Sequence, residues 1–309
     1  MPEQDIQNAL SPRSAYQLAE VVKTPPQYSA ITPRWLSKFL ELKPVETGIF
    51  RLNKVKNTDT TLDFLCTQAN SADIPEGFLD YELSPREYIL TSVSTIVKIG
   101  TRVSDLYSKP FDQVKEQLRL GMETIKERQE HLIINSDDYG LLKNIDTAQH
   151  LRSRHGAPTP DDFDALITKV WKEPSFFLAH PLAIAAFGRS CTRRGVPPVA
   201  TTHFGAPFLT WRGIPIVPCD KLRVRTPDGD GNGKTDILLI RSGESRQGVI
   251  GLYQTGLPGE QSAGLSVRFM GIDNKGVGFY LLSIYCSAAI LTEDAIAVLE
   301  DVDTGYGDD

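Results

Sequence analysis

The sequence predicts an α+β fold, in which helices and strands occupy separate stretches of the chain. One long helical stripe runs through 109–134, and one clean alternation of β-branched residues runs from Ile89 to Ile99. Most of the remaining strand-like segments follow one another between 208 and 291, divided by Gly and Pro. This order lacks the regular strand and helix alternation of a parallel sheet, so an α/β fold is disfavoured.

The first 45 residues are predicted to form a polar, proline-marked arm. Two short amphipathic helices are expected, over 11–22 and 32–42, with Thr32 as the N-cap of the second and Pro33 at its first position. Prolines at 25 and 26 keep the connection between them extended. The apolar side chains of the arm therefore need another surface, which is the chain's own core in a monomer and a neighbour in an oligomer.

A long two-stranded excursion is predicted between Ile49 and Leu83. This stretch is rich in Thr and Asp and alternates locally, as from Thr61 to Leu65. Because a lone hairpin is marginally stable in water, this one must lie on another surface. The strand that follows places six β-branched residues on one face, namely Ile89, Thr91, Val93, Thr95, Val97 and Ile99.

The helix over 109–134 is the strongest secondary-structure prediction. Ser108 and Pro110 suit its beginning, and the segment 135–137 ends it. At about 1.5 Å per residue it is roughly 39 Å long, which is the length of a small domain. Its apolar stripe consists of Val114, Leu118, Met122, Ile125 and Leu132. The opposite, charged side consists of Glu116, Arg119, Glu123, Lys126, Glu127 and Glu130.

Two shorter helices and a series of strands follow. One helix begins at Thr159, where a cap, a proline and two acidic residues complement the helix dipole. The other runs over 181–194 and stops at Gly195. Strands are expected over 208–217, 237–241, 248–253, 265–272 and 277–291.

Composition excludes several classes of protein. The 309 residues include 33 Lys and Arg against 39 Asp and Glu, and the net charge of −6 disfavours a nucleic-acid binder. The longest strongly apolar run, 278–291, is shorter than the ~20 residues of a membrane helix. No secretory signal is visible, and the four cysteines stand singly, without a disulfide or zinc pattern. A cytoplasmic protein is expected.

Residues 228–233 match the first half of a calcium-binding loop. Asp228, Asp230 and Asn232 stand at positions one, three and five, and Gly233 stands at position six. Position twelve should be a bidentate Glu, but Leu239 occupies it within an expected strand. A solvated hairpin tip is the favoured interpretation, and a cation site over 228–236 is the alternative.

The other candidate motifs lack a necessary part. The run 233–235 imitates the end of a phosphate-binding loop, but Asp228 replaces a required glycine and a strand replaces the helix. The segment 243–247 resembles a nucleophile elbow without its closing glycine. The five histidines lack metal-ligand spacing, and His150 and His155 are expected in a solvated loop. We therefore expect no catalytic, cofactor or metal residues.

Several long segments of the chain are far more specific than these short motifs. They are KTPPQYSAITPRWLSKFL (23–40), SPREY (84–88), 101–130, 156–189 and 244–269. In this order they resemble the family 2A encapsulin shell proteins, which have the major-capsid-protein fold of tailed phages. The resemblance extends from Lys23 to about Val302.

The resemblance implies a domain organisation. It consists of an N-terminal arm over 1–45, an E-loop hairpin over 46–85, and a peripheral domain over 86–150 whose spine helix is 109–134. Strands around 265–292 complete the peripheral domain. An axial domain occupies mainly 151–264, and 293–309 form a C-terminal strand and acidic tail.

The resemblance also implies a function. The family forms closed icosahedral shells, of about 60 copies here, around a cargo enzyme. The usual cargo is a pyridoxal-phosphate-dependent cysteine desulfurase, and the implied role is sulfur storage. The pyridoxal phosphate belongs to the cargo and not to this chain.

Aromatic and apolar residues of the arm and hairpin are the expected assembly residues, and ordinary packing within one chain is the alternative. They are Trp35, Leu36, Phe39, Phe64, Phe78 and Tyr81. Two other functions remain open, a phage-type capsid that packages DNA and an enzyme of unrecognised mechanism that uses the 228–236 loop.

Overall fold

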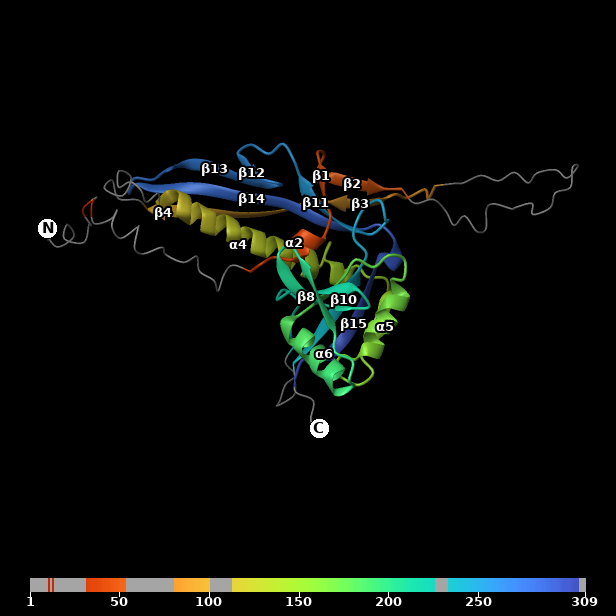
Figure 1. Cartoon of the computed structure of the whole chain (residues 1–309). Coiled ribbons are helices and arrows are strands. Elements are labelled where there is room, and N and C mark those ends of the chain that lie inside the picture. The colour runs from red at the N-terminus through yellow and green to blue at the C-terminus, as the bar shows by residue number, and fades with distance from the viewer. Residues whose placement is uncertain are drawn as a thin grey trace, which may run out of the picture.

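The described residues form two large β-sheets and one two-stranded sheet; one long helix covers the first large sheet, and two shorter helices cover the second (Figure 1). The structure is a computed structural model that describes residues 11 and 13 and the ranges 32–53, 81–100, 113–225 and 233–305. Among the described residues, no helix combines the length and the apolar character needed to cross a membrane.

The first sheet is built on the longest strand, β14 (Val277–Ile290). β4 (Thr91–Gly100) pairs antiparallel with β14 over the whole length of β4, from Thr91 opposite Cys286 to Gly100 opposite Val277. The remaining order is β1-β11-β14-β13-β12. These strands are β1 (Leu42–Val45), β11 (Val249–Gln254), β12 (Glu260–Ser262) and β13 (Leu265–Ile272).

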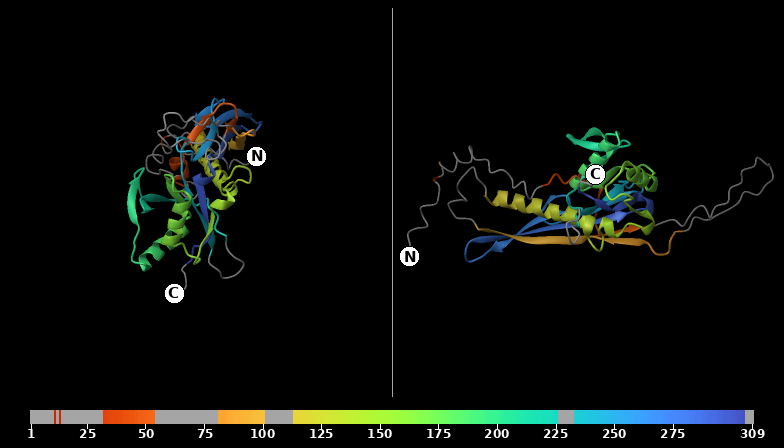
Figure 2. Two further views of the ribbon diagram at one scale, coloured as in Figure 1. Left: turned by 90° about the vertical axis from the view of Figure 1, so that its right-hand side faces the viewer. Right: turned by 90° about the horizontal axis from the view of Figure 1, so that it is seen from below.

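One long helix, α4 (Gln113–Asn135), lies lengthwise on the first sheet, beside β4 and β14 (Figure 2). Leu118, Met122 and Ile125 of its predicted stripe pack on the sheet residues Leu282 and Ile284. Gly121 faces the same sheet, where a Cβ would lie 3.1 Å from side-chain carbons of Val97 and Leu282. The absence of a side chain at this position therefore allows the close approach. The predicted end of the helix is confirmed, while 109–112 lie outside the described residues.

The second sheet has seven strands in the order β5-β15-β10-β6-β9-β8-β7. Its strands are β5 (His150–Arg152), β6 (Phe176–Ala179), β7 (Val199–His203), β8 (Ala206–Trp211), β9 (Ile214–Pro218), β10 (Lys234–Ile240) and β15 (Ile296–Asp303). Short 3₁₀ turns cover 141–143, 147–149 and 293–295.

Both faces of the second sheet are buried, which explains its continuous apolar runs. In β10, Ile237 and Leu239 face the helices α5 (Pro160–Lys169) and α6 (Pro181–Arg193), while Leu238 and Ile240 face the opposite core. That opposite core also holds Ile134 from the end of α4.

The local predictions for α5 and α6 are confirmed. Thr159 and Asp162 form a reciprocal capping box, in which the Thr159 hydroxyl accepts from the Asp162 N–H and the Asp162 carboxylate accepts from the Thr159 N–H. His180 caps α6, because its Nδ1 accepts from the Leu182 N–H at 3.2 Å. Gly195 follows α6 with a φ of 71°, as expected of a glycine that ends a helix.

The predicted helix over 32–42 is wrong. Only a single turn forms, α2 (Leu36–Phe39), and Thr32 does not cap it. The backbone N–H and the hydroxyl of Thr32 instead donate to Glu127 of α4, 95 residues away, and Arg34 has a left-handed φ of 46°. A tertiary hydrogen bond has therefore replaced the local cap.

The single strand predicted over 208–217 is also wrong, since two strands form there. β8 and β9 meet at the two-residue turn Arg212-Gly213, whose φ values of 51° and 84° are those of a type I′ hairpin turn. Asp164 of α5 fixes this turn, because its carboxylate accepts from both the Arg212 guanidinium and the Trp211 indole N–H. β6 and β7 were not predicted.

The hairpin predicted from Ile49 is described only at its base. β2 (Ile49–Leu52) pairs antiparallel with β3 (Arg86–Ile89), and Ile49 lies opposite Ile89. Phe50 and Tyr88 pack on the face of the first sheet around Ile250 and Ala289. Residues 54–80, and the predicted helix over 11–22 apart from residues 11 and 13, lie outside the described residues.

Candidate assembly site at the amino-terminal arm

The described part of the arm is packed against its own chain. Leu36 exposes 1% of its surface and belongs to the main core. Trp35 meets Phe208 of β8 edge to face, with ring centroids 5.0 Å apart. Phe39 contacts Phe176 at 5.3 Å and Phe208 at 5.4 Å. The surface that these side chains require is therefore available within one subunit.

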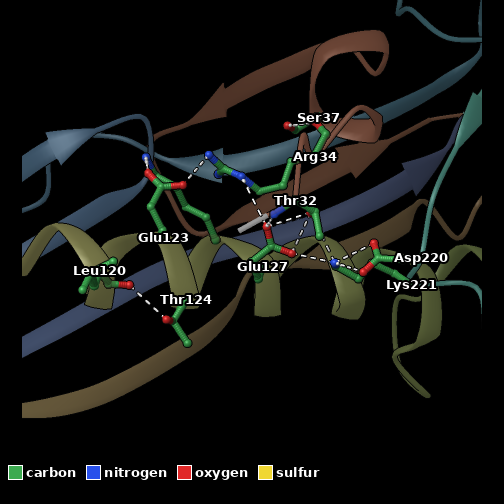
Figure 3. A network of polar contacts seen from close by, with 10 residues as sticks. Thr32, Arg34, Ser37, Leu120, Glu123, Thr124, Glu127, Asp220 and Lys221 are labelled. Atoms are coloured by element: carbon green, nitrogen blue, oxygen red, sulfur yellow. Dashed lines mark hydrogen bonds and ion pairs between the residues drawn. The ribbon is translucent and has the colours of Figure 1, made fainter. Parts of the chain in front are cut away.

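A polar network fixes the arm to α4 from the other side (Figure 3). Glu127 accepts from the Thr32 N–H at 2.9 Å and from the Thr32 hydroxyl at 2.8 Å, and its second oxygen lies 2.6 Å from the Lys221 ammonium. Lys221, which follows β9, also binds Asp220 at 2.7 Å. Arg34 completes the network with a 2.7 Å ion pair to Glu123. The arm, the spine helix and the second sheet meet at this point.

The electrostatics of the network favour its ionised form. Burial alone would raise the pKa of Glu127, but hydrogen bonds from Lys221 and Thr32 outweigh it and lower that pKa. Burial likewise opposes the charge of Lys221, yet its bonds to Asp220 and Glu127 raise its pKa. Both groups are therefore charged at neutral pH and hold each other in place.

Glu127 and Glu130, which were predicted on the charged side of the spine helix opposite its apolar stripe, are largely shielded from solvent. Glu130 exposes only 4% of its surface. The available signal was a second stripe of Glu123, Glu127, Glu130 and Ile134, which are spaced by four, three and four residues and so share one face. This face packs against the arm, so the carboxyl half of α4 is buried on two sides.

A second cluster joins the two sheets where the chain crosses between them. The crossovers are 241–248, from β10 to β11, and 291–295, from β14 to β15. Arg241 of the first crossover is 3% exposed, and its guanidinium donates to Asp294 and to the Thr292 hydroxyl of the second, each at 2.7 Å. Burial would raise the pKa of Asp294, but hydrogen bonds from Arg241, Thr292 and Lys172 hold it well below its usual range.

Two other sequence motifs were candidate sites, the segment that resembles a nucleophile elbow and the calcium-like loop. The segment 243–247 lies within the first crossover and leads into β11, not into a helix. Asp236 forms a bidentate pair with Arg225, with both distances 2.7 Å, and Leu239 is buried in β10. Residues 226–232 of the calcium-like loop lie outside the described residues. In the described ranges, His, Cys, Asp and Glu side chains form no group of three that could hold a metal ion.

His150 lies in a strand and not in a loop, while 31% of its side chain is still exposed to solvent. His150 begins β5, which pairs parallel with β15, and its Nδ1 lies 2.8 Å from a carboxylate oxygen of Glu300.

Of the six expected assembly residues, Tyr81 is 62% exposed at the base of the hairpin, and Phe64 and Phe78 lie outside the described residues. The assembly role of all six stays a prediction.

Comparison with known proteins agrees with this architecture. Residues 50–306 match the family described as type 2A encapsulin shell protein, SrpI-like. The type 2A encapsulin shell protein SrpI of Synechococcus elongatus is 57% identical over 297 residues, which cover 96% of this chain and 95% of that protein. A relative from Mycolicibacterium paratuberculosis with the same shell-protein description is 56% identical, over 97% of this chain and 96% of its own.

Solved structures extend the likeness to three dimensions. The holo-SrpI encapsulin complex from Synechococcus elongatus superimposes with a TM-score of 0.81 at 54% identity, over 96% of this chain and 98% of that chain. The capsid of the native GTA particle has a TM-score of 0.58 at 14% identity, over 95% and 100% of the two chains, and so shares the fold alone. The predicted capsid-like α+β fold is confirmed. This chain belongs to the type 2A encapsulin shell proteins.

Proposed function

We propose that this chain is the subunit of a closed icosahedral protein shell of about 60 copies that encloses a cargo enzyme. The observation that carries the proposal is the similarity of nearly the whole chain, at 54–57% identity, to proteins named as encapsulin shell proteins. A closed shell has a defined size, because growth of the particle stops when its heterologous contacts form a closed arrangement.

Exposed apolar side chains on the first sheet support contacts between subunits. Ile96 of β4 and Phe269, Met270 and Ile272 of β13 each expose half or more of their surface. Covering such side chains is worth about 25 cal/mol per Å² of apolar area, so contacts that bury them would favour association. Neighbouring subunits would supply the cover.

We propose a pyridoxal-phosphate-dependent cysteine desulfurase as the cargo, with a role in sulfur storage, in the cytoplasm. The proposal rests on the family resemblance. The shell chain would contribute no catalysis, and the pyridoxal phosphate would be bound by the cargo.

Size-exclusion chromatography with negative-stain imaging tests the shell. The expected result is uniform hollow particles from the purified chain alone. A 34 kDa monomer or small oligomer that persists across salt and pH would refute the shell and direct attention to the 228–236 loop. Particles with the absorbance ratio of nucleic acid would instead favour a phage-type capsid.

Purification of the particle from its natural source tests the cargo. Mass spectrometry of the contents should identify a desulfurase. When the particle is opened, the absorbance of bound pyridoxal phosphate should be found in the fraction that contains the released desulfurase and not in the shell fraction. Hollow particles that consistently contain a different enzyme would refute the desulfurase while leaving the shell intact.

A further inference from the structure

Glu130 is a buried acid whose environment differs from that of Glu127, one helical turn away. It lies on α4 beneath the arm, beside Leu36 and Leu40. The Leu36 N–H donates to its carboxyl group, while its Oε1 atom is buried and has no hydrogen-bond partner among the described residues. Glu127 has Thr32 and Lys221 as partners on its two oxygens. The seam under the arm therefore contains one satisfied and one unsatisfied carboxyl group.

Lys221, a cation close enough to influence Glu130, is already paired with other carboxylates. Its ammonium lies within 2.8 Å of oxygens of Glu127 and Asp220, and Glu130 has no ion pair among the described residues. Burial raises the pKa of Glu130 most, Lys221 lowers it, and Glu127 and Asp220 raise it. The charged or titratable groups that line this seam, from the arm, from α4 and from the segment after β9, are Arg34, Lys126, Glu127, Cys219, Asp220 and Lys221.

We propose that Glu130 is a proton-controlled latch, which holds the arm against α4 while its carboxyl group is neutral and loosens the arm when that group ionises. A neutral carboxyl adds no charge beside Leu36 and Leu40, although the Leu36 N–H by itself favours the ionised form. An ionised one places a charge beside Leu36 and Leu40 with an unpartnered oxygen, which costs free energy unless the seam opens to water.

The direction of the pH response follows from burial. Desolvation is the largest influence and raises the pKa of Glu130 from 4.5 to about 7. The folded arm thus binds this proton more tightly than the open arm does. The stabilisation is fully present below the ordinary value of 4.5 and is lost as the pH rises through 7. Glu127 has the opposite sign, because its pKa is lowered, so its contribution is lost only in acid.

Hydrogen exchange of the full chain, followed by mass spectrometry, tests the latch. The measured quantity is the protection of amides in 36–45, with each rate divided by the intrinsic rate at that pH and compared with amides of β10. In the wild-type chain we expect protection to fall about tenfold from pH 6 to pH 8.5. Over this range the equilibrium constant between the closed and the open arm changes by about a factor of ten, the equivalent of one pKa unit. In Glu130→Gln the change should be less than twofold.

Matched variants separate the latch from a general loss of structure. Glu127→Gln should lower protection of the arm at both pH values and keep most of the pH response. Glu130→Met removes the charge with an apolar side chain of similar length, and should also abolish the response if the glutamine variant folds poorly. A flat wild-type profile, or a response that persists in a folded Glu130 variant, would overturn the proposal. Because the latch acts within one chain, the hydrogen-exchange result could still be interpreted if the shell proposal failed.

Discussion

Arg241 is almost entirely buried, so its guanidinium depends on the partners that the two crossovers provide. Asp294 neutralises it, and the Thr292 hydroxyl and the Lys172 carbonyl accept further N–H groups, while its buried Nε has no hydrogen-bond partner among the described residues. The pair thus joins the segment that leaves the second sheet to the segment that returns to it. A single ion pair contributes little at a surface, but a buried cation that loses its counter-charge is costly.

Asp294→Asn should therefore lower the free energy of unfolding by about 1–2 kcal/mol, since the amide still accepts a hydrogen bond but leaves Arg241 without a counter-charge. Because the pKa of Asp294 is depressed in the fold, its contribution is present above the ordinary Asp range and is lost as the pH falls below that range through the depressed value of the folded state. The difference between wild type and variant, measured by urea unfolding, should consequently shrink in acid. Asp161→Asn, at an exposed pair with Arg194, should change stability by less than about 0.5 kcal/mol at any pH. Equal losses in both variants would contradict this assignment.

At the scale of elements, α2 is too short to be stable by itself, since a single turn satisfies few of its own hydrogen bonds. Its position depends on Phe39, whose ring contacts three phenylalanine rings on β6, β8 and the turn between β7 and β8, those of Phe176, Phe208 and Phe204. The arm is thus stabilised by packing on a sheet that forms far away in sequence.

Phe39→Ala should detach the turn, with a loss of about 2–3 kcal/mol in unfolding free energy for a ring that is only partly buried. Faster hydrogen exchange in 36–45, with unchanged exchange in α5, is the local measurement. Trp171→Ala offers a matched control, because Trp171 is 67% exposed and its removal should leave both quantities nearly unchanged. Arm exchange at the wild-type rate in Phe39→Ala would show that the polar network alone holds the arm.

Elements with local causes were predictable from the sequence, and elements with distant causes were not. The caps of α5 and the stop of α6 are formed by residues within four positions, so their patterns are visible in the chain. The false helix at 32–42 arose because Glu127, 95 residues away, accepts the bonds that a local cap would have made. β6 escaped prediction because a four-residue strand buried on both faces shows no alternation.

At the scale of the whole molecule, strand pairing links distant parts of the chain, and propensity does not specify such pairs. β4 and β14 meet through residues such as Ser94 and Ser283, whose hydroxyl groups bond at 2.9 Å across a separation of 189 residues. The capsid-like fold could be expected only because long segments resemble a family. The stripe of Glu123, Glu127 and Glu130 could have indicated the α4 side of the arm network, but Lys221 could not be predicted, since it lies in a loop whose place beside Glu127 depends on the completed second sheet.

The first sheet gives a direct test of contacts between whole molecules. Ile96 and Ile272 expose 50% and 68% of their surfaces, so replacing both with Ser removes little buried area within one chain. Unfolding free energy should change by less than about 1 kcal/mol. If neighbouring subunits cover these side chains, each lost apolar contact recurs at every equivalent interface of a symmetric shell, and small losses multiply over the particle.

The double variant should then shift the elution profile from particle to subunit, while Arg152→Ser, at a side chain that is 83% exposed, should not. Intact particles at wild-type yield from a folded double variant would place the subunit contacts elsewhere, and a folding defect of several kcal/mol would mean that the two isoleucines stabilise the sheet itself.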